Sequence, residues 1–281
     1  MTALTVSAPF ELAQRQINIL VIGCGGNGSS FIQNSLYRLH VALKGLGHDF
    51  GLKVWVADGE LVSETNVLRS AFYPQDIGQN KAYLLASRMN LSGLNADFEA
   101  IQENLTPAEV SKYINTYRID FVIGAVDDAQ FRVNLVDYFA RPSFNGGEHE
   151  CMYLDMGNEN HTGQCIFGTL VSSKNTKIKL PTVVDLFPEI RTIKTDKKRS
   201  CSAAESFSNQ GILINQQCAL IAGRILADYL TKPSIAHHGA IFDLDKMTMT
   251  PIKINPKVWE VYGYKADIDV EKQQDKTLET V

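Results

Sequence analysis

Cysteine is scarce in this sequence and shows no paired spacing. Five cysteines stand among 281 residues, and no two of them form a CxxC pair. Their odd number and irregular gaps argue against a disulfide framework, and the missing pairs argue against a four-cysteine zinc site. Unpaired cysteines are typical of a reducing compartment. We therefore expect a cytoplasmic protein without structural zinc.

Long apolar runs and a strong charge of one sign are also missing. The chain has 27 basic and 31 acidic residues, a formal net charge of −4, and 44% hydrophobic residues. Such a composition is that of a globular protein, and no run reaches the roughly 18 apolar residues of a membrane span. The slightly acidic balance predicts no general affinity for nucleic acid. We expect neither a membrane nor a nucleic acid as partner.

Short apolar runs alternate with helical patterns in the first half of the chain. The runs are rich in β-branched residues, which is typical of buried parallel strands. We predict strands over 17–22, 52–57, 97–101 and 121–125, with the third at a sheet edge, and helices over 29–46, 81–90 and 128–140. This alternation predicts an α/β fold with a doubly wound, mostly parallel, Rossmann-like sheet.

The second half changes character. MYLDM and QCIFGTLV are predicted strands with no helix between them, and a long helix is expected over 208–230. This pattern indicates a mixed or antiparallel C-terminal extension. The expected organisation is an N-terminal segment (1–16), one main domain (17–264) with a crossover loop at about 172–206 and a terminal hairpin at about 239–254, and a charged, mobile tail (265–281).

A glycine cluster follows the first predicted strand. GCGGNG places Gly23, Gly25 and Gly28 in the three positions of GxGxxG, between a strand and a helix. This spacing allows a tight turn and brings backbone N–H groups and a helix N-terminus to a phosphate. The second strand ends at Asp58, whose carboxylate can accept hydrogen bonds from ribose hydroxyls. Up to this point a dehydrogenase explains the sequence equally well.

Charged residues downstream favour a triphosphate. Arg69 and Lys81, with Asn66, follow the second strand, and two cations suit a ligand with more negative charge than a dinucleotide. Asp127 and Asp128 follow the strand at 121–125, at an edge where open α/β sheets bind ligands. A carboxylate facing phosphates makes sense mainly with Mg²⁺ between them. Taken singly, each charge could instead lie on the surface or, for Asp128, cap a helix.

These motifs together resemble the ThiF/MoeB/HesA family, the bacterial relatives of ubiquitin-activating enzymes. The resemblance covers about residues 17 to 230. It rests on GCGGNG, DxE at 58–60, NxxR at 66–69, DIGxxKA at 76–82, DDxxxR at 127–132, TGQ at 162–164 and SCSAAE at 200–205. Within the family, the sequence most resembles the ThiF proteins of plasmid-borne PRTRC systems, whose neighbours include a ubiquitin-like small protein.

The resemblance implies an activity and a site. Members of this family adenylate the C-terminal carboxylate of a ubiquitin-like or sulfur-carrier-like protein with ATP, often as homodimers. By resemblance the glycine turn and Asp58 hold the nucleotide, Asn66, Arg69 and Lys81 hold the phosphates, and Asp127 holds Mg²⁺. The implied nucleotide-binding residues are Gly23, Gly25, Gly26, Gly28, Asp58, Asn66, Arg69, Lys81 and Asp127. The attacking carboxylate is already ionised near neutral pH, so no general base is required.

The roles of one cysteine and one arginine stay open. Cys201 falls where several family members carry a crossover-loop cysteine, after Lys197, Lys198 and Arg199, which favour a thiolate. It is either an acyl acceptor or an ordinary loop cysteine. Many members also send an N-terminal arginine into the partner subunit's ATP site. Arg15 stands close to the first strand, which argues against that role without deciding it.

Other functions compete with this one. Adenylation of a non-protein, peptide or tRNA-linked carboxylate would use the same residues, and a non-catalytic docking subunit could keep the fold alone. Among these alternatives, the sequence favours a dehydrogenase least. His149, His237 and His238 lack the spacing of metal ligands, so we expect them to be solvated loop residues.

Overall fold

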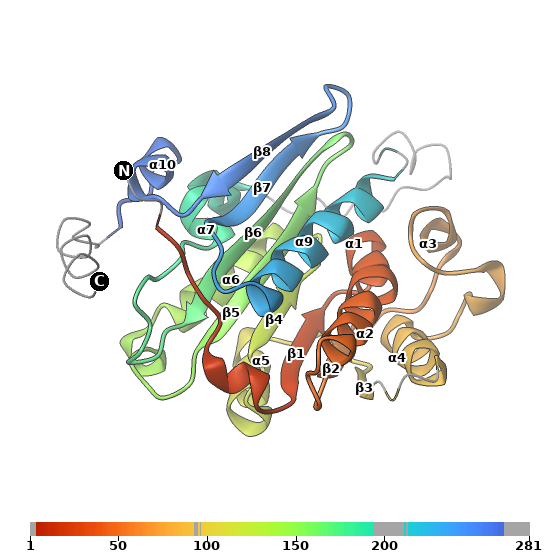
Figure 1. The fold of residues 1–281 in the computed structure, drawn as a ribbon. Coiled ribbons are helices and arrows are strands. Elements are labelled where there is room, and N and C mark those ends of the chain that lie inside the picture. Colours follow the sequence, from red (N-terminus) through yellow and green to blue (C-terminus); the bar gives the residue numbers. More distant parts are fainter. Residues whose placement is uncertain (1–3, 93–94, 96, 194–210, 212, 267–281) are drawn as a thin grey trace.

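An eight-stranded mixed sheet forms the centre of the molecule (Figure 1). The computed structural model describes residues 4–92, 95, 97–193, 211 and 213–266. Across the sheet the strand order is β3-β2-β1-β4-β5-β6-β7-β8. The strands are β1 (Ile17–Ile22), β2 (Leu52–Ala57), β3 (Asp97–Ile101), β4 (Phe121–Gly124), β5 (Cys151–Asn158), β6 (Thr162–Val171), β7 (His237–Asp243) and β8 (Thr248–Lys253). The first five are parallel and the rest pair antiparallel, which confirms the predicted fold class.

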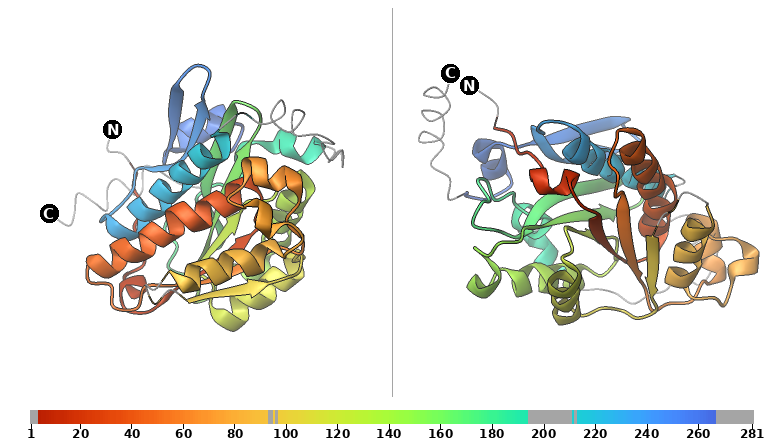
Figure 2. Two further views of the ribbon diagram at one scale, coloured as in Figure 1. Left: turned by 90° about the vertical axis from the view of Figure 1, so that its right-hand side faces the viewer. Right: turned by 60° about the horizontal axis from the view of Figure 1, so that its bottom comes forward.

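Helices cover both faces of the sheet, which makes three layers (Figure 2). The helical elements are η1 (Phe10–Ala13), α1 (Gly26–Ser30), η2 (Phe31–Leu36), α2 (Tyr37–Gly45), α3 (Glu64–Arg69), η3 (Pro74–Asp76), α4 (Lys81–Leu91), α5 (Pro107–Tyr117), α6 (Ala129–Phe139), η4 (Pro142–Phe144), α7 (Val183–Leu186), η5 (Pro188–Thr192), α9 (Ile214–Thr231) and α10 (Pro256–Val261). The continuous segment α1–η2–α2 lies beside α9 and α4 on one face, and α5 and α6 lie on the other.

Burial explains why the central strands are uniformly apolar. Every residue of β4 is buried, as are nearly all of β1 and β5, because helices cover both faces there. At the margins of the sheet, β8 is largely exposed and β3 is mostly half-buried. The predicted edge position of β3 is thus confirmed.

The strand order creates a crevice. From β1 the chain runs to β2 and β3 on one side, whereas β4 and β5 lie on the other side of β1. In open α/β sheets, ligands bind at such a reversal, outside the carboxyl ends of the strands. Gly23 follows β1, Asp58 follows β2 and Ala125 follows β4, so all three stand at this edge.

The expected crossover loop is partly helical. Its described part contains α7 and η5, which pack against α6 and against each other. Residues 194–206 of that loop, and most of the expected tail (267–281), lie outside the described residues.

His238 corrects one expectation. It is fully buried on β7, between the carbonyl of Phe167 (Nδ1···O 2.8 Å) and the indole of Trp259 (Nε1···Nε2 2.8 Å). The indole N–H can only donate, so Nε2 accepts and Nδ1–H donates to Phe167. The expectation of a solvated histidine is therefore wrong here, because the imidazole ties α10 to the sheet.

Candidate functional site

The glycine turn connects β1 to the helix over 26–45. Gly23 has a φ of +94°, and a Cβ atom there would lie 2.7 Å from the carbonyl oxygen of Ala125. At Gly28 a Cβ atom would lie 1.9 Å from the carbonyl oxygen of Gly23. These two glycines are required by the close packing of the turn itself.

Gly25 differs from its neighbours. A Cβ atom at Gly25 would meet nothing within 4 Å, whereas at Gly26 it would lie 2.4 Å from the side-chain amide of Asn215. Packing within the described chain therefore does not require glycine at position 25. Glycine at an open position of such a turn is suited to the close approach of a phosphate.

Asp58 links the end of β2 to the glycine turn. Its carboxylate accepts hydrogen bonds from the backbone N–H of Cys24 (2.7 Å) and of Glu60 (2.8 Å). Burial raises the pKa of Asp58, while Lys81 and the two N–H groups oppose this rise. Burial also raises the pKa of the Cys24 thiol well above its usual value, so Cys24 is a packing residue rather than a nucleophile.

Lys81 is the cation most firmly placed in the crevice. It is the first residue of α4, its side chain is 5% exposed, and its Nζ lies 2.7 Å from the Glu60 carboxylate. Asn80 caps the helix by accepting from the Tyr83 N–H, and its amide donates to the carbonyl of Asp58 (2.9 Å). The start of α4 is therefore held against the end of β2, which brings Lys81 beside Asp58.

Asn66 and Arg69 lie on the short helix α3. The side-chain oxygen of Asn66 accepts from the N–H of Ser63 (2.9 Å), so this residue closes a capping box. That local contact accounts for its burial without a ligand. Arg69 stands half-buried in the last turn, and its carbonyl accepts from the amide of Asn215 (3.2 Å).

Asp127 and Asp128 have different surroundings. Asp128 caps α6 by accepting from the N–H of Gln130 (2.9 Å). Asp127 precedes it and is exposed at the carboxyl end of β4. Mg²⁺ in nucleotide sites is usually held by one or two carboxylates together with phosphates of the substrate, and a single exposed carboxylate fits that mode. The part of the chain that is described has no group of three or more metal-ligating side chains.

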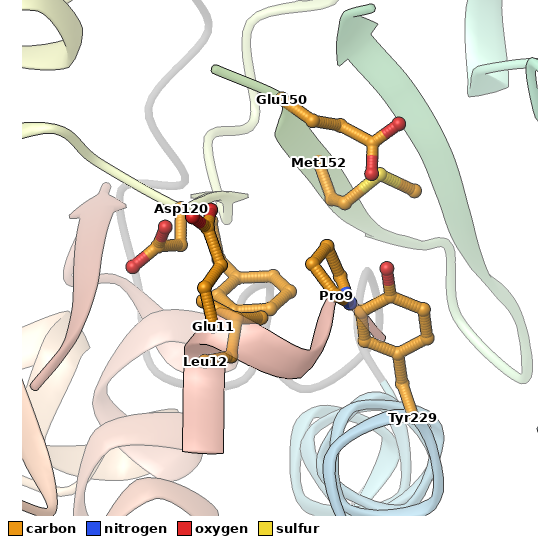
Figure 3. A pocket seen from close by; sticks show the side chains of 8 residues that line it. Pro9, Glu11, Leu12, Asp120, Glu150, Met152 and Tyr229 are labelled. Carbon is orange, nitrogen blue, oxygen red and sulfur yellow. The ribbon is translucent and has the colours of Figure 1, made fainter. Parts of the chain in front are cut away.

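Arg15 lies at the opposite end of the sheet. Its guanidinium holds the carboxylate of Asp120 through two hydrogen bonds of 2.8 and 2.6 Å, just before β1 and β4 begin. Asp120 also lines a cavity of about 10 Å³, which Figure 3 shows between Glu150, Met152 and Tyr229. Arg15 and this cavity are thus separated from the glycine turn by the length of the strands. Cys201 lies outside the described residues.

The structure adds residues that the motifs did not indicate. Asn80 could have been found, because an asparagine before a helical pattern is a common N-cap. Asn215 could not, since it is 146 positions from Arg69 in sequence and no local pattern marks it. It joins the start of α9 to both α3 and the glycine turn.

Comparisons with known proteins agree with this architecture. Among solved structures, PaaA superposes with a TM-score of 0.59 and 16% identity, over 86% of this chain and 65% of PaaA. E. coli MccB with ATP superposes with a TM-score of 0.54 and 15% identity, over 86% of this chain and 65% of MccB. E. coli MccB with MccA-N7isoASN superposes with a TM-score of 0.54 and 16% identity, over 85% of this chain and 65% of MccB. At such identities the likeness establishes the fold, and this chain spans 65% of the length of these relatives.

No curated protein matches the sequence. Within the described ranges, no helix has both the length and the apolar character needed to cross a bilayer. The sequence model of the ThiF family matches residues 5–259, which is most of the chain. The chain belongs to the ThiF family.

Proposed function

We propose that this protein uses ATP to adenylate a carboxylate and releases pyrophosphate. The observation that carries the proposal is the gathering, at the carboxyl ends of β1, β2 and β4, of an open glycine turn, a buried lysine and two carboxylates. A solved structure of a relative with the same fold, E. coli MccB, contains ATP.

The proposed roles follow from charge. In this reaction an anionic carboxylate attacks an anionic phosphate, so cations fixed beforehand must offset the repulsion. Lys81 and Arg69 supply that charge with Asn66 beside them, and the glycine turn supplies backbone N–H groups. Asp58 holds the ribose, and Asp127 would hold a Mg²⁺ ion, which neutralises phosphate charge when bound.

For the substrate we propose the C-terminus of a ubiquitin-like small protein, which is the substrate that the resemblance to the ThiF/MoeB/HesA family implies. A cavity of about 550 Å³ lies between α9 and the β7–β8 hairpin. Leu220 and Met249 on its lining are 64% and 60% exposed. Exposed apolar side chains around a groove are typical of protein-binding surfaces.

The groove is also well placed. Gln217 lines it, two residues after Asn215, which touches the glycine turn. A protein seated on the groove could therefore extend its C-terminus along α9 to the nucleotide. We further propose a homodimer, and Cys201 as the acceptor of the activated acyl group, with adenylate leaving as the thioester forms.

Exchange of labelled pyrophosphate into ATP tests the adenylation. We expect exchange that depends on the ubiquitin-like partner and falls at least a hundredfold in Asp127→Ala and in Arg69→Ala, with Arg191→Ala as a surface control. Exchange that survives both changes contradicts the assigned site. Small carboxylates, peptides and RNA, assayed in place of the protein, test the alternative substrates. Absence of ATP binding in calorimetry would instead favour a docking subunit.

A second measurement addresses Cys201. Mass spectrometry after incubation with ATP and the partner should detect a thiol-sensitive adduct that is lost in Cys201→Ala. Pyrophosphate exchange should persist in that variant, because adenylation precedes the transfer. An adduct that remains in Cys201→Ala would place the acceptor elsewhere.

A further inference from the structure

Arg132 lies inside the protein, although its sequence position also allowed a surface residue. It stands on α6, five residues after Asp127, and is only 8% exposed. Burial lowers the pKa of its guanidinium, but nearby anions, Asp155 first and Asp127 among them, raise it overall. Arg132 is therefore a buried cation close to the crevice.

The guanidinium holds the backbone just before Asp127. Its Nε and Nη2 atoms donate to the carbonyl of Val126 at 3.2 and 2.7 Å. Nη2 also donates to the carbonyl of Met156 on β5 at 3.1 Å. Through one planar group, the loop after β4 is thus attached to the neighbouring strand.

A buried carboxylate orients this guanidinium. Asp155 on β5 is fully buried, and its Oδ1 lies 3.4 Å from the Nε of Arg132. The hydroxyl of Tyr153 donates to the same oxygen at 2.9 Å. Because burying charges costs free energy unless they are paired, Arg132 and Asp155 depend on each other.

Two glycines make room for this network. A Cβ atom at Gly124 would lie 2.3 Å from the Tyr153 hydroxyl, and one at Gly157 would lie 2.8 Å from Nη1 of Arg132. The strands around the network are therefore shaped to admit the polar groups between sheet and helix.

Hydrogen bonds fix the residues on both sides of Asp127. Arg132 holds the carbonyl of residue 126, and Asp128 on the other side caps α6 through the N–H of Gln130. The cap of α6 comes from Asp128, whereas the bonds of Arg132 reach the carbonyl on the other side of Asp127. The bonds to Val126 instead define where the exposed carboxylate of Asp127 stands at the crevice.

We propose that Arg132, oriented by Asp155, is a positioning residue that presents Asp127 to the Mg²⁺-bound nucleotide; this inference rests on the proposed function. Arg132 itself does not touch the nucleotide. Lysine at this position keeps the charge, but it lacks the planar fork that reaches two carbonyls and a carboxylate together.

The experiment compares Mg²⁺-dependent ATP binding in four proteins by calorimetry. They are the wild type, Arg132→Lys, Asp155→Asn and the control Arg191→Lys. The control alters an exposed ion pair between Arg191 and Asp137, and Asp137 lies on α6, the helix that carries Arg132. For Arg132→Lys we expect the Mg²⁺ concentration that gives half of the binding enhancement to rise about tenfold, with ATP affinity in the absence of Mg²⁺ changed less than twofold. Asp155→Asn should shift it in the same direction by a smaller factor, and it serves as the test if Arg132→Lys does not fold.

A double variant separates positioning from general stability. If Arg132 acts through Asp127, adding Arg132→Lys to Asp127→Asn should cause no further loss of Mg²⁺-dependent binding. Additive losses, or a wild-type Mg²⁺ dependence in both single variants, would overturn the inference and leave the proposed function standing. A wild type that does not bind MgATP would overturn the proposed function, and this inference with it.

Discussion

The ammonium of Lys81 lies 2.7 Å from the carboxylate of Glu60. The two side chains differ in exposure, since that of Lys81 is 5% exposed and that of Glu60 is 53% exposed. The buried lysine is thus neutralised by a carboxylate that stands half in solvent. A phosphate that binds Lys81 must compete with that carboxylate.

This competition predicts that Glu60→Gln tightens ATP binding. Removing the charge frees the ammonium and also removes an anion beside the phosphates. Ion pairs with an exposed partner are worth about 0.2–1 kcal/mol, so we expect a gain of up to about fivefold in affinity. Lys81→Ala should weaken binding at least tenfold. Calorimetry measures both, and weaker binding by Glu60→Gln would indicate that Glu60 itself contacts the nucleotide.

The glycines of the turn should separate folding from binding. In Gly25→Ala the added Cβ atom would meet no atom within 4 Å. The free energy of unfolding of this variant should therefore fall by no more than about 1 kcal/mol, the cost of alanine at a helix N-cap. Its ATP affinity should fall strongly, because the methyl group occupies the place proposed for a phosphate. Gly28→Ala should lose more than about 3 kcal/mol of stability, since its Cβ would lie 1.9 Å from a backbone carbonyl. Urea unfolding and ATP titration distinguish the two, and full ATP affinity in Gly25→Ala would contradict the proposed phosphate position.

Arg15 should matter for stability and not for nucleotide binding within its own subunit. Arg15→Ala leaves the carboxylate of Asp120, 3% exposed, without its guanidinium partner. Breaking such a pair costs about 3 kcal/mol. Arg118→Ala is a matched control, because its ion pair with Glu11 is 47% exposed on both sides and should contribute under about 1 kcal/mol. Equal losses in the two variants would contradict this assignment.

Acid should destabilise the fold through His238. Burial lowers the pKa of this imidazole from 6.5 to about 4. Between these pH values the imidazole is protonated in the unfolded chain and neutral in the native protein. The contribution of His238 to the free energy of unfolding is therefore fully present above about pH 6.5 and is lost as the pH falls toward 4. We expect His238 to cost about 2 kcal/mol between pH 7 and pH 5. Urea unfolding of the wild type and of His238→Gln at both pH values measures it, and parallel pH dependences would rule out this origin.

Local patterns were sufficient for much of the fold. Apolar runs and their alternation with helices predicted the parallel core. The capping box of Thr106 and Glu109 at the start of α5 is a local signal of the same kind. GCGGNG predicted the turn after β1, and the order of the elements placed the acidic residues after β4 at the carboxyl edge of the sheet, where Asp127 lies. Such signals are readable because each depends on residues a few positions apart.

Contacts between segments that are distant in sequence could not be predicted from local patterns. The burial of His238 depends on Trp259 in a later helix, and that of Arg132 on α6 depends on Asp155 in strand β5. The exposed fraction of a charged side chain is decided by what the fold places over it. A motif therefore identified Arg132 and Lys81 as residues of interest, but not their partners.

By itself the sequence determined the fold class, the glycine turn and the set of residues that point to nucleotide chemistry, because turn geometry and apolar periodicity are properties of short segments. Only the tertiary structure decided that Arg15 lies at the far end of the sheet, that Glu60 neutralises Lys81 and that Arg132 holds the backbone before Asp127. These relationships join segments distant in sequence, and the energies of buried charges depend on partners that only the folded chain brings within reach.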